Sequence, residues 1–434
     1  MNVCVYTLGC RLNQCESEAI SDSFVREGFS VVGEEESASL CIVNTCTVTS
    51  KAEQKARRMI RLFAKRAEAV VVTGCYAEMN ADELKKLGDN VTVVPLVKKA
   101  SLLELASHIK TSLMAGATLS ESVESFADHD ASPFSYRAES FSYHSRSYLK
   151  IQEGCDNECA YCRVHVARGK SQSLERGEVI KRALELEAAG FSEIVLTGVN
   201  LTMYDHEGEG LGGLLLELLP TLKETTRIRL SSMEPDHIDE RLIEACSDVR
   251  MHPHFHIPLQ SASDRVLKRV NRKYSASHLE WVIDELRRVK DDPFIACDVI
   301  TGLPSETAED FEITRSFLEE KGFAALHVFP FSPRPDTPLA NPRDRVEERV
   351  RDERAAVLRK LSAELSDAYI SRQIGKHGEV LLETRKDGAF YGTTGNYLKV
   401  RIENVPLSAQ RGQLLSGTLT EKGVFTLDEA QCGL

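Results

Sequence analysis

The stretch Gly154–Cys162 reads Gly-Cys-Asp-Asn-Glu-Cys-Ala-Tyr-Cys and is the densest group of cysteines in the chain. Its Cys-x3-Cys-x2-Cys spacing supplies three thiols, Cys155, Cys159 and Cys162, with no fourth cysteine beside them. Thiolates are the usual ligands of iron–sulfur clusters, which take four ligands when fully ligated. Three close cysteines therefore predict a cluster in which one iron is open to a small-molecule ligand.

An open iron of this kind can chelate the amino and carboxylate groups of S-adenosylmethionine (SAM), whose sulfonium is then cleaved to a 5′-deoxyadenosyl radical by one electron. In such a site the cofactor carries the hard chemistry, while the protein fixes the geometry and excludes water. Tyr161, directly before the last cysteine, fits this pattern. Two alternatives stay open here. A structural zinc site needs a fourth ligand, for which His165 is the nearby candidate. A thioredoxin-like Cys159-x-x-Cys162 pair leaves Cys155 unexplained.

The whole chain has 434 residues and a hydrophobic fraction of 42%, which is typical of a globular protein with roughly two to four domains. No stretch approaches the roughly 18 apolar residues of a membrane span, and Met1–Tyr6 reads as a strand, not as a signal peptide. We therefore expect a cytoplasmic protein without a membrane partner. In a reducing compartment, twelve cysteines favour metal binding or catalysis over disulfides.

The net charge of −12 argues against a general nucleic-acid binder. One segment is different, because Lys51–Arg66 holds seven Lys or Arg residues against the single acid Glu53. Apolar residues at i, i+3, i+4 and i+7 within it predict a helix whose charges point outward. This basic island is either a solvated helix face or a selective contact with phosphate.

Hydrophobic patterning predicts an α/β protein with three structured regions. Residues 1–115 alternate short apolar runs with amphipathic segments, which predicts a parallel α/β domain. Residues 116–140 are serine-rich and read as a linker. Residues 141–372 contain six further strand–helix units, which predict a partial (β/α)6 barrel with its chemistry at the C-terminal strand ends. Residues 373–434 show short alternating runs broken by glycines, as in a small all-β barrel.

The expected elements of these regions are as follows. In the N-terminal region the strands are Val3–Leu8, Leu40–Val43, Ala69–Thr73 and Val91–Val94, with helices Gln14–Glu27, Lys51–Lys65 and Ala81–Leu87. The six barrel strands are Tyr148–Ile151, Glu193–Leu196, Ile228–Leu230, His254–Ile257, Phe294–Ile300 and Ala325–Phe329, and a long helix covers Arg343–Arg372. The last region has strands Glu379–Glu383, Asn396–Ile402, Gly417–Leu419 and Val424–Leu427.

Three further cysteines lie in distinctive sequence motifs, each of which follows a predicted strand. The words are Thr7–Asn13 (Thr-Leu-Gly-Cys-Arg-Leu-Asn), Asn44–Thr49 (Asn-Thr-Cys-Thr-Val-Thr) and Thr73–Tyr76 (Thr-Gly-Cys-Tyr). Parallel strands end at one edge, so three loops there can bring Cys10, Cys46 and Cys75 together, although scattered core cysteines would give the same spacing. With these words and the cysteine triad, nearly the whole chain resembles the radical-SAM methylthiotransferase family.

The resemblance implies two [4Fe-4S] clusters, one on the triad and a second, sulfur-supplying one on Cys10, Cys46 and Cys75. Several words favour the MtaB-type branch, which adds a methylthio group to C2 of N6-threonylcarbamoyladenosine at tRNA position 37. They are Arg229–Glu234, His256–Ser261 and His327–Ser332, together with the start of the chain. The C-terminal barrel resembles a TRAM domain. The chain departs from the family pattern at Arg163, where an apolar residue is common.

For the SAM pocket, the resemblance implies a set of residues after the barrel strands, namely Tyr161, Gly198, Gln260, Ser261, Asp298, Ile300, Gly302 and Phe329. Turn glycines and core packing are the plain alternatives for this set. For RNA, the candidates are Arg168, Lys399 and Arg401, with the target base turned out of its stack. The expected partners are the tRNA anticodon stem-loop, an electron donor such as flavodoxin or ferredoxin, and a sulfur source.

Two other functions remain open from the sequence. The same chemistry could act on N6-isopentenyladenosine in tRNA or on an aspartate of a ribosomal protein, as in the sister branches. A non-catalytic iron–sulfur protein that binds RNA or relays electrons would also carry these cysteines, and SAM cleavage separates it from an enzyme.

Overall fold

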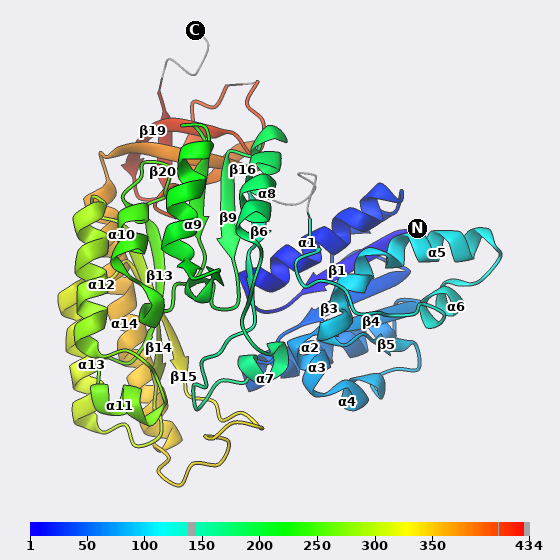
Figure 1. Ribbon diagram of the computed structural model, residues 1–434, viewed down its shortest axis with the longest axis horizontal. Helices are drawn as coiled ribbons and strands as arrows, with labels where there is room; N and C mark the ends of the chain where they lie inside the picture. Colours follow the sequence, from blue (N-terminus) through cyan, green and yellow to red (C-terminus); the bar gives the residue numbers. More distant parts are fainter. Residues whose placement is uncertain (138–144, 407, 429–434) are drawn as a thin grey trace. The chain divides into compact units, whose positions relative to one another are not determined.

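The computed structural model describes residues 1–137, 145–406 and 408–428, and the chain forms two compact units (Figure 1). The first unit contains Met1–Ser142, Glu153–Gln172 and Arg334–Ala340, and the second contains Tyr143–Gln152, Ser173–Pro333 and Asn341–Leu434. The cysteine triad therefore packs in the same unit as the N-terminal residues. The domain boundaries drawn from the sequence stay predictions.

The first unit is built on a five-stranded parallel sheet of order β2-β1-β3-β4-β5. The strands are β1 (Asn2–Thr7), β2 (Ser30–Val32), β3 (Leu40–Thr45), β4 (Ala69–Gly74) and β5 (Val91–Val93). All residues of β3 and β4 are buried, as expected for central strands covered on both faces. Four strands confirm the sequence prediction. The edge strand β2 was missed because its apolar run is only two residues long, Val31 and Val32, and none of its residues is fully buried.

Helices cover both faces of this sheet. One core joins the sheet to α1 (Arg11–Arg26), η1 (Leu96–Leu103), α5 (Leu105–Met114) and α6 (Leu119–Glu124), and the other joins it to α2 (Ser50–Ala64) and α4 (Ala81–Lys85). The short α3 (Cys75–Met79) follows β4 directly. Part of the expected serine-rich linker is therefore helical, since the capping box of Thr118 and Glu121 starts α6 and Leu119 and Val123 are buried.

The second unit has six parallel strands, in two groups ordered β12-β9-β6 and β13-β14-β15. Single bridges from Ile228 to Met251 and from Ser232 to His256 connect the groups. The strands are β6 (Ser147–Lys150), β9 (Glu193–Thr197), β12 (Arg227–Leu230), β13 (His254–Gln260), β14 (Phe294–Thr301) and β15 (Ala325–Pro330). All six lie where the sequence predicts them, which confirms the partial barrel.

Helices between these strands are α8 (Arg176–Ala188), α9 (Leu211–Leu218), α10 (Glu240–Cys246), α11 (Asp264–Arg269), α12 (Ala276–Val289) and α13 (Ala308–Lys321). Shorter pieces are α7 (Val164–Arg168), η2 (Leu201–Met203), η3 (Leu219–Thr221) and η4 (Pro235–His237), with two-residue strands β7 (Gln152–Glu153), β8 (Gln172–Ser173), β10 (Asp205–His206) and β11 (Glu209–Gly210). The long helix α14 (Glu348–Gln373) begins five residues later than the expected Arg343. Asp344 instead accepts a backbone hydrogen bond from Ser305 at 2.8 Å and pairs with Arg269.

The C-terminal region is a closed five-stranded barrel of order β16-β17-β18-β20-β19. Its strands are β16 (His377–Lys386), β17 (Ala389–Thr394), β18 (Lys399–Glu403), β19 (Leu414–Glu421) and β20 (Val424–Leu427). The sequence predicts this barrel but not β17. A Cβ at Gly392 would lie 2.3 Å from the Leu381 carbonyl oxygen, so β17 needs a glycine at its closest approach to β16, and this glycine weakens its strand pattern.

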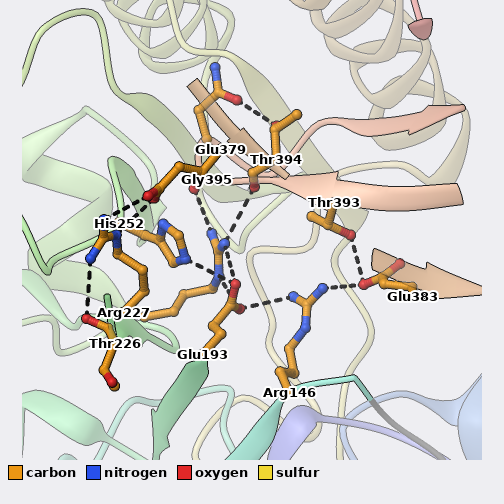
Figure 2. Close-up of polar contacts among 12 residues, drawn as sticks. Arg146, Glu193, Thr226, Arg227, His252, Glu379, Glu383, Thr393, Thr394 and Gly395 are labelled. Atoms are coloured by element: carbon orange, nitrogen blue, oxygen red, sulfur yellow. Dashed lines mark hydrogen bonds and ion pairs between the residues drawn. The ribbon is translucent and has the colours of Figure 1, made fainter. Parts of the chain in front are cut away.

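A buried ionic network joins the C-terminal barrel to the strand core within the second unit (Figure 2). Glu193 on β9 pairs with Arg229 at 2.8 Å and Arg146 at 3.3 Å, and accepts a hydrogen bond from His252 Nε2 at 2.9 Å. Arg229 donates to the carbonyl oxygen of Gly395 at 3.0 Å, and Arg146 also pairs with Glu383 on β16. We call these residues the Glu193 network; it fixes the barrel through charges buried in the junction.

The Glu193 network predicts a loss of stability in acid. Burial and then Arg229 lower the pKa of His252 to about 4, so the folded chain holds this imidazole neutral. The neutral form stabilises the fold fully above the ordinary pKa of about 6.5, and this contribution is lost as pH falls toward 4. We expect the free energy of unfolding to drop by about 3 kcal/mol from this group over that window. Chemical denaturation of wild-type and His252→Gln chains at several pH values measures it, and equal pH slopes for the two chains would contradict it.

Among the described residues, no helix is long and apolar enough to span a membrane.

Candidate functional site

The first unit brings Cys10, Cys46 and Cys75 to one edge of its sheet, as predicted. Cys10 is the N-cap of α1 after β1, Cys46 follows β3, and Cys75 opens α3 after β4. Because β1, β3 and β4 are parallel neighbours, their C-terminal ends lie side by side. Gly9 has φ of +102°, and a Cβ there would lie 2.9 Å from Cys46 Sγ, so the loops of Cys10 and Cys46 are in close contact.

Polar residues in the motifs around these cysteines form the hydrogen bonds that hold the loops. Asn13 donates to the carbonyl oxygens of Leu8 at 2.8 Å and Thr45 at 3.1 Å, which ties the Cys10 loop to the Cys46 loop. Thr45 Oγ1 donates to the Thr73 carbonyl at 2.6 Å and accepts from the Ala77 amide at 3.1 Å, which ties the Cys46 loop to the Cys75 loop. The polar residues in these words are therefore structural partners of the thiols.

The three thiols share one electrostatic environment. Cys46 and Cys75 are buried and Cys10 is exposed. Burial, together with Cys10 and Cys75, raises the pKa of Cys46 to about 12, against the opposing effects of the Val48 amide and Arg168. Without a metal the chain therefore holds Cys46 as a thiol, and a bound metal would have to displace its proton.

Arg168 links this cysteine group to the triad segment. Its Nε donates to Cys75 Sγ at 3.3 Å, and its Nη2 donates to Asn13 Oδ1 at 2.7 Å. Its Nη1 reaches both oxygens of Glu153 at 2.9 Å and Glu16 Oε1 at 3.1 Å. The side chain is only 1% exposed, so in this conformation it cannot contact an RNA phosphate as the sequence suggested. Nothing around the residue in the sequence signals its buried carboxylate partners.

Glu16 is itself held by a second buried cation. Lys99 Nζ pairs with Glu16 and donates to Asn44 Oδ1 at 2.8 Å, and Asn44 Nδ2 donates to the Asn13 carbonyl at 3.0 Å. Burial lowers the pKa of Lys99, and the Glu16 carboxylate opposes that change. Two buried cations thus face two buried carboxylates, Glu16 and Glu153, directly beside Cys75.

The triad segment folds back on itself within the first unit. Gly154 has φ of +72°, and a Cβ there would lie 1.9 Å from the Lys170 carbonyl oxygen, so only glycine fits. The Cys155 amide donates to the Gly169 carbonyl at 3.0 Å, and the Cys162 amide donates to the Cys159 carbonyl at 2.9 Å. Cys159 is buried, whereas Cys155 and Cys162 are half-buried. The three thiols therefore stand on one short, closed loop.

Arg163, one of the positions where the chain departs from the family pattern, takes part in ion pairs. It donates to Thr47 Oγ1 at 3.2 Å and pairs with Glu53 at 3.1 Å and Asp336 at 2.7 Å. Arg334 pairs with the same Glu53 carboxylate. Thr47 follows Cys46 and Arg163 follows Cys162, so this cluster ties the residues after two candidate ligands to α2.

Each of the two cysteine sets supplies three thiols, one fewer than the four protein ligands of a closed structural zinc site. Three thiolates leave one ligand position of an iron–sulfur cluster to another molecule. Among the described residues, no group of three or more His, Cys, Asp or Glu side chains is arranged to hold one metal ion.

In the second unit, the predicted SAM residues of β14 and β15 lie on one face of the sheet. Asp298 pairs in register with His327, and Ile300 pairs with Phe329, which is 43% exposed. Asp298 Oδ1 lies 2.9 Å from His256 Nε2, and the rings of His256 and His327 are 5.3 Å apart. Neither histidine was among the predicted SAM residues, although each begins one of the motifs that favour the MtaB-type branch.

Other predicted SAM residues have packing roles. A Cβ at Gly198 would lie 2.7 Å from Gln152 Oε1, and one at Gly302 would lie 2.4 Å from Arg351 Cγ, so neighbouring side chains already occupy both spaces. Ser261 Oγ hydrogen-bonds to Thr314 Oγ1 at 3.1 Å. Gln260 has a left-handed φ of +63° at the end of β13. Tyr161 is half-buried in the first unit. Their roles toward SAM stay predictions.

A buried pair stands after the ends of β12 and β13. Arg272 Nη2 donates to Glu234 Oε2 at 2.6 Å and to the Pro258 carbonyl at 2.7 Å. Burial raises the pKa of Glu234 to about 7, against the opposing effect of Arg272. A perturbed carboxyl at the C-terminal ends of parallel strands is typical of a functional site.

The two RNA candidates of the C-terminal barrel lie in exposed ion pairs. Lys399 is 2.9 Å from Glu383 and Arg401 is 2.7 Å from Glu403, with the cations 65% and 47% exposed. Exposed pairs are weak and exchange readily, so an RNA phosphate can compete with the carboxylates. Their contact with RNA stays a prediction.

Comparisons with known proteins show the family to which the chain belongs. Residues 2–95 match the Uncharacterized protein family UPF0004, and residues 149–318 match the Radical SAM superfamily. The chain is 36% identical to the threonylcarbamoyladenosine tRNA methylthiotransferase MtaB of Treponema pallidum, over 93% of this chain and 98% of the relative. It is 35% identical to the protein of that name from Bacillus subtilis, over 92% and 89%.

Two other likenesses are broader. A tRNA-2-methylthio-N(6)-dimethylallyladenosine synthase from Endomicrobium trichonymphae is 32% identical over 93% of this chain and 94% of that protein. The radical S-adenosylmethionine methyltransferase TsrM from Kitasatospora setae, with cobalamin and a [4Fe-4S] cluster bound, has a TM-score of 0.56 at 15% identity and covers 78% of this chain and 74% of its own. The fold, the two cysteine sets and these near full-length relatives show that the chain belongs to the MtaB-type methylthiotransferase family of radical SAM enzymes.

Proposed function

We propose that this enzyme adds a methylthio group to C2 of N6-threonylcarbamoyladenosine at tRNA position 37, and that it works in the cytoplasm. Relatives that are 35–36% identical to this chain are named threonylcarbamoyladenosine tRNA methylthiotransferases. The observation that carries the proposal is the arrangement of Cys10, Cys46 and Cys75 at one sheet edge, with Arg168 between Cys75 and the triad segment. The reaction needs hydrogen abstraction, sulfur insertion and methylation. Two sets of cysteine ligands suit this series of steps, because radical formation and sulfur supply can then use separate clusters.

For the cofactors, we propose that Cys155, Cys159 and Cys162 hold a [4Fe-4S] cluster that binds SAM, and that Cys10, Cys46 and Cys75 hold a second [4Fe-4S] cluster. When bound, SAM and the two clusters together would supply the 5′-deoxyadenosyl radical, the sulfur and the methyl group. The chain's own residues bind these groups and fix the loops that carry the cysteines. Asn13 and Thr45 fix the loops, and the Arg168 guanidinium balances the negative charge of Glu16 and Glu153 beside Cys75.

The remaining parts of the proposal concern domains and partners. Residues 1–115 would form the methylthiotransferase domain, 141–372 the radical-SAM domain and 373–434 a TRAM-like domain, with a linker at 116–140. The SAM residues would be Tyr161, Gly198, Gln260, Ser261, Asp298, Ile300, Gly302 and Phe329. The partners would be the tRNA anticodon stem-loop, a flavodoxin or ferredoxin and a sulfur source, and Lys399 and Arg401 would contact the tRNA.

The test is mass spectrometry of tRNA nucleosides from cells with and without the gene. We expect 2-methylthio-N6-threonylcarbamoyladenosine to disappear on deletion and to return with the wild-type gene. Cys159→Ala should not restore it, because the triad then lacks a thiolate. Cys246→Ala is the matched control: this cysteine is buried in α10 of the second unit, whereas both cysteine sets belong to the first, and it should restore the nucleoside.

Two outcomes would redirect the proposal. Loss of the isopentenyl counterpart would favour the dimethylallyl branch, to which a 32% identical relative belongs. An unchanged tRNA would point to the ribosomal-protein substrate, or to an iron–sulfur protein without catalysis if purified chain also failed to cleave SAM.

A further inference from the structure

Five cations form a row along the outward side of α2 and its C-cap: Lys51, Lys55, Arg58 and Arg61 on the helix and Lys65 at the C-cap. At 3.6 residues per turn, they fall within about 120° of the helix circumference and extend about 21 Å along its axis. All five are exposed. Ala56, Ile60 and Phe63 occupy the opposite side and pack into the core. We call this surface the α2 basic row.

The α2 basic row has no anionic partner in the part of the chain that the structure describes. Its half-buried neighbour Arg57 does pair, with Glu83 at 3.6 Å. Lys55 lies over the Tyr6 ring at 5.8 Å, which leaves its charge uncompensated. Glu53, the acid within α2, is turned inward and belongs to Arg163 and Arg334. The row is therefore a free cationic surface in a chain of net charge −12.

Helix stability does not explain this arrangement. Lys51 and Lys55 are like charges at i and i+4, as are Arg61 and Lys65, and such pairs destabilise a helix. Lys51 also stands in the first turn, where the helix dipole disfavours cations. Some exposed cations of other helices are neutralised, as Arg349 with Glu353 on α14 and Arg315 with Glu319 on α13 show.

We propose that the α2 basic row binds the phosphate backbone of the tRNA substrate, an inference that rests on the proposed function. The cations recur every three or four residues, about 5–6 Å apart, which presents a line of charges suited to a linear polyanion. Phosphate contacts of this kind fix the position of the nucleic acid without reading its sequence. Because the rest of the chain is acidic, the row directs where the tRNA binds.

The experiment measures tRNA affinity against salt for the reconstituted full-length enzyme. The row variant carries Lys51→Gln, Lys55→Gln, Arg58→Gln and Arg61→Gln. The control variant removes four exposed but ion-paired cations of other helices, through Lys181→Gln, Arg288→Gln, Arg349→Gln and Lys360→Gln. Both lose the same net charge. The probe is an anticodon stem-loop with N6-threonylcarbamoyladenosine at position 37, titrated by fluorescence anisotropy at several salt concentrations.

We expect the row variant to bind about 10- to 100-fold more weakly near 0.15 M salt. The slope of log K against log salt should shrink by about 3, since each released phosphate contact contributes about 0.7–0.9. The control variant should keep the wild-type slope. The thermal midpoint of the row variant should stay or rise, because like charges have been removed from the helix.

An unchanged slope and affinity in the row variant would overturn the proposal. If only the rate of cluster reduction by flavodoxin fell, the row would be a docking surface for an acidic electron donor, and the tRNA assignment would also be wrong. A wild-type enzyme that binds the stem-loop through the row but makes no methylthio product would refute the proposed function and leave the row standing. If the wild-type enzyme makes the product and the row variant binds the stem-loop as tightly as the wild type, only the proposed role of the α2 basic row would be refuted.

Discussion

Replacement of Arg168 by methionine is expected to lower the free energy of unfolding by about 3–5 kcal/mol. Its guanidinium is the shared partner of Glu16 and Glu153, and a methionine side chain leaves both carboxylates buried beside Cys75 with less compensating charge. Lys99 continues to balance Glu16, so Glu153 bears most of the loss. Urea denaturation followed by far-ultraviolet circular dichroism measures the change.

The same substitution should also lower the iron content of the reconstituted chain. Arg168 holds Asn13 and the Cys75 thiol together with the triad segment, and partners of this kind set ligand orientation, with typical losses of about 10- to 100-fold in metal affinity when they are removed. Arg168→Lys keeps the charge but not the fork of donors, so we expect an intermediate loss.

The matched control is Lys170→Met, two residues away. Lys170 is 81% exposed, and its Nζ comes no closer than 3.8 Å to Asp156 Oδ1. Its loss should therefore change the free energy of unfolding by no more than about 0.5 kcal/mol. Equal stabilities and iron contents for the Arg168 and Lys170 variants would show that the buried cluster of charges is not needed.

Glu193→Gln is expected to destabilise the second unit by a similar amount, about 3–5 kcal/mol. The glutamine keeps the shape of Glu193 but not its charge, which leaves Arg229 and Arg146 buried without their common carboxylate. Burial would raise the pKa of Glu193, but Arg229, His252 and Arg146 together lower it well below its ordinary value, so the lost group is an anion at neutral pH.

Trp281 makes this measurement specific. It is the single tryptophan of the chain and lies on α12 in the second unit, so its fluorescence reports unfolding there. Glu185→Gln, on exposed α8 and 3.9 Å from Lys181, removes one charge of the same kind as a control. If both variants unfolded at the same urea concentration as the wild-type chain, the Glu193 network would have no role in stability.

Much of the fold could be predicted from the sequence because its elements are strongly periodic. Four of the five strands of the N-terminal sheet contain apolar runs, and the full burial of β3 and β4 requires such runs. The six strands of the partial barrel could be placed as well, although some of them, such as β6 and β12, mix apolar with polar or charged residues. Among the elements that were missed or shifted, β2 depends on its edge position, β17 on a close-approach glycine, and the start of α14 on contacts of Asp344. None of these leaves a periodic signal.

The candidate site divides in the same way. The cysteine words and their place after parallel strands were readable, because strand direction alone brings Cys10, Cys46 and Cys75 to one edge. The binding partners of Arg168 could not be predicted, because a single arginine in a sequence gives no sign of whether it binds a phosphate or two buried carboxylates. The space beside Gly198 and Gly302 likewise depended on Gln152 and Arg351, which lie far from them in the chain.

The sequence by itself determined the class of the protein, since ligand types, their spacing and the period of apolar residues are local properties of the chain. Only the tertiary structure decided which charges are free and which are engaged. Arg168 became part of the cysteine site, Arg163 joined α2 to the triad loop, and the α2 basic row stayed without partners. The reason is that an ion pair between distant residues depends on distance and burial, and these arise only when the chain packs.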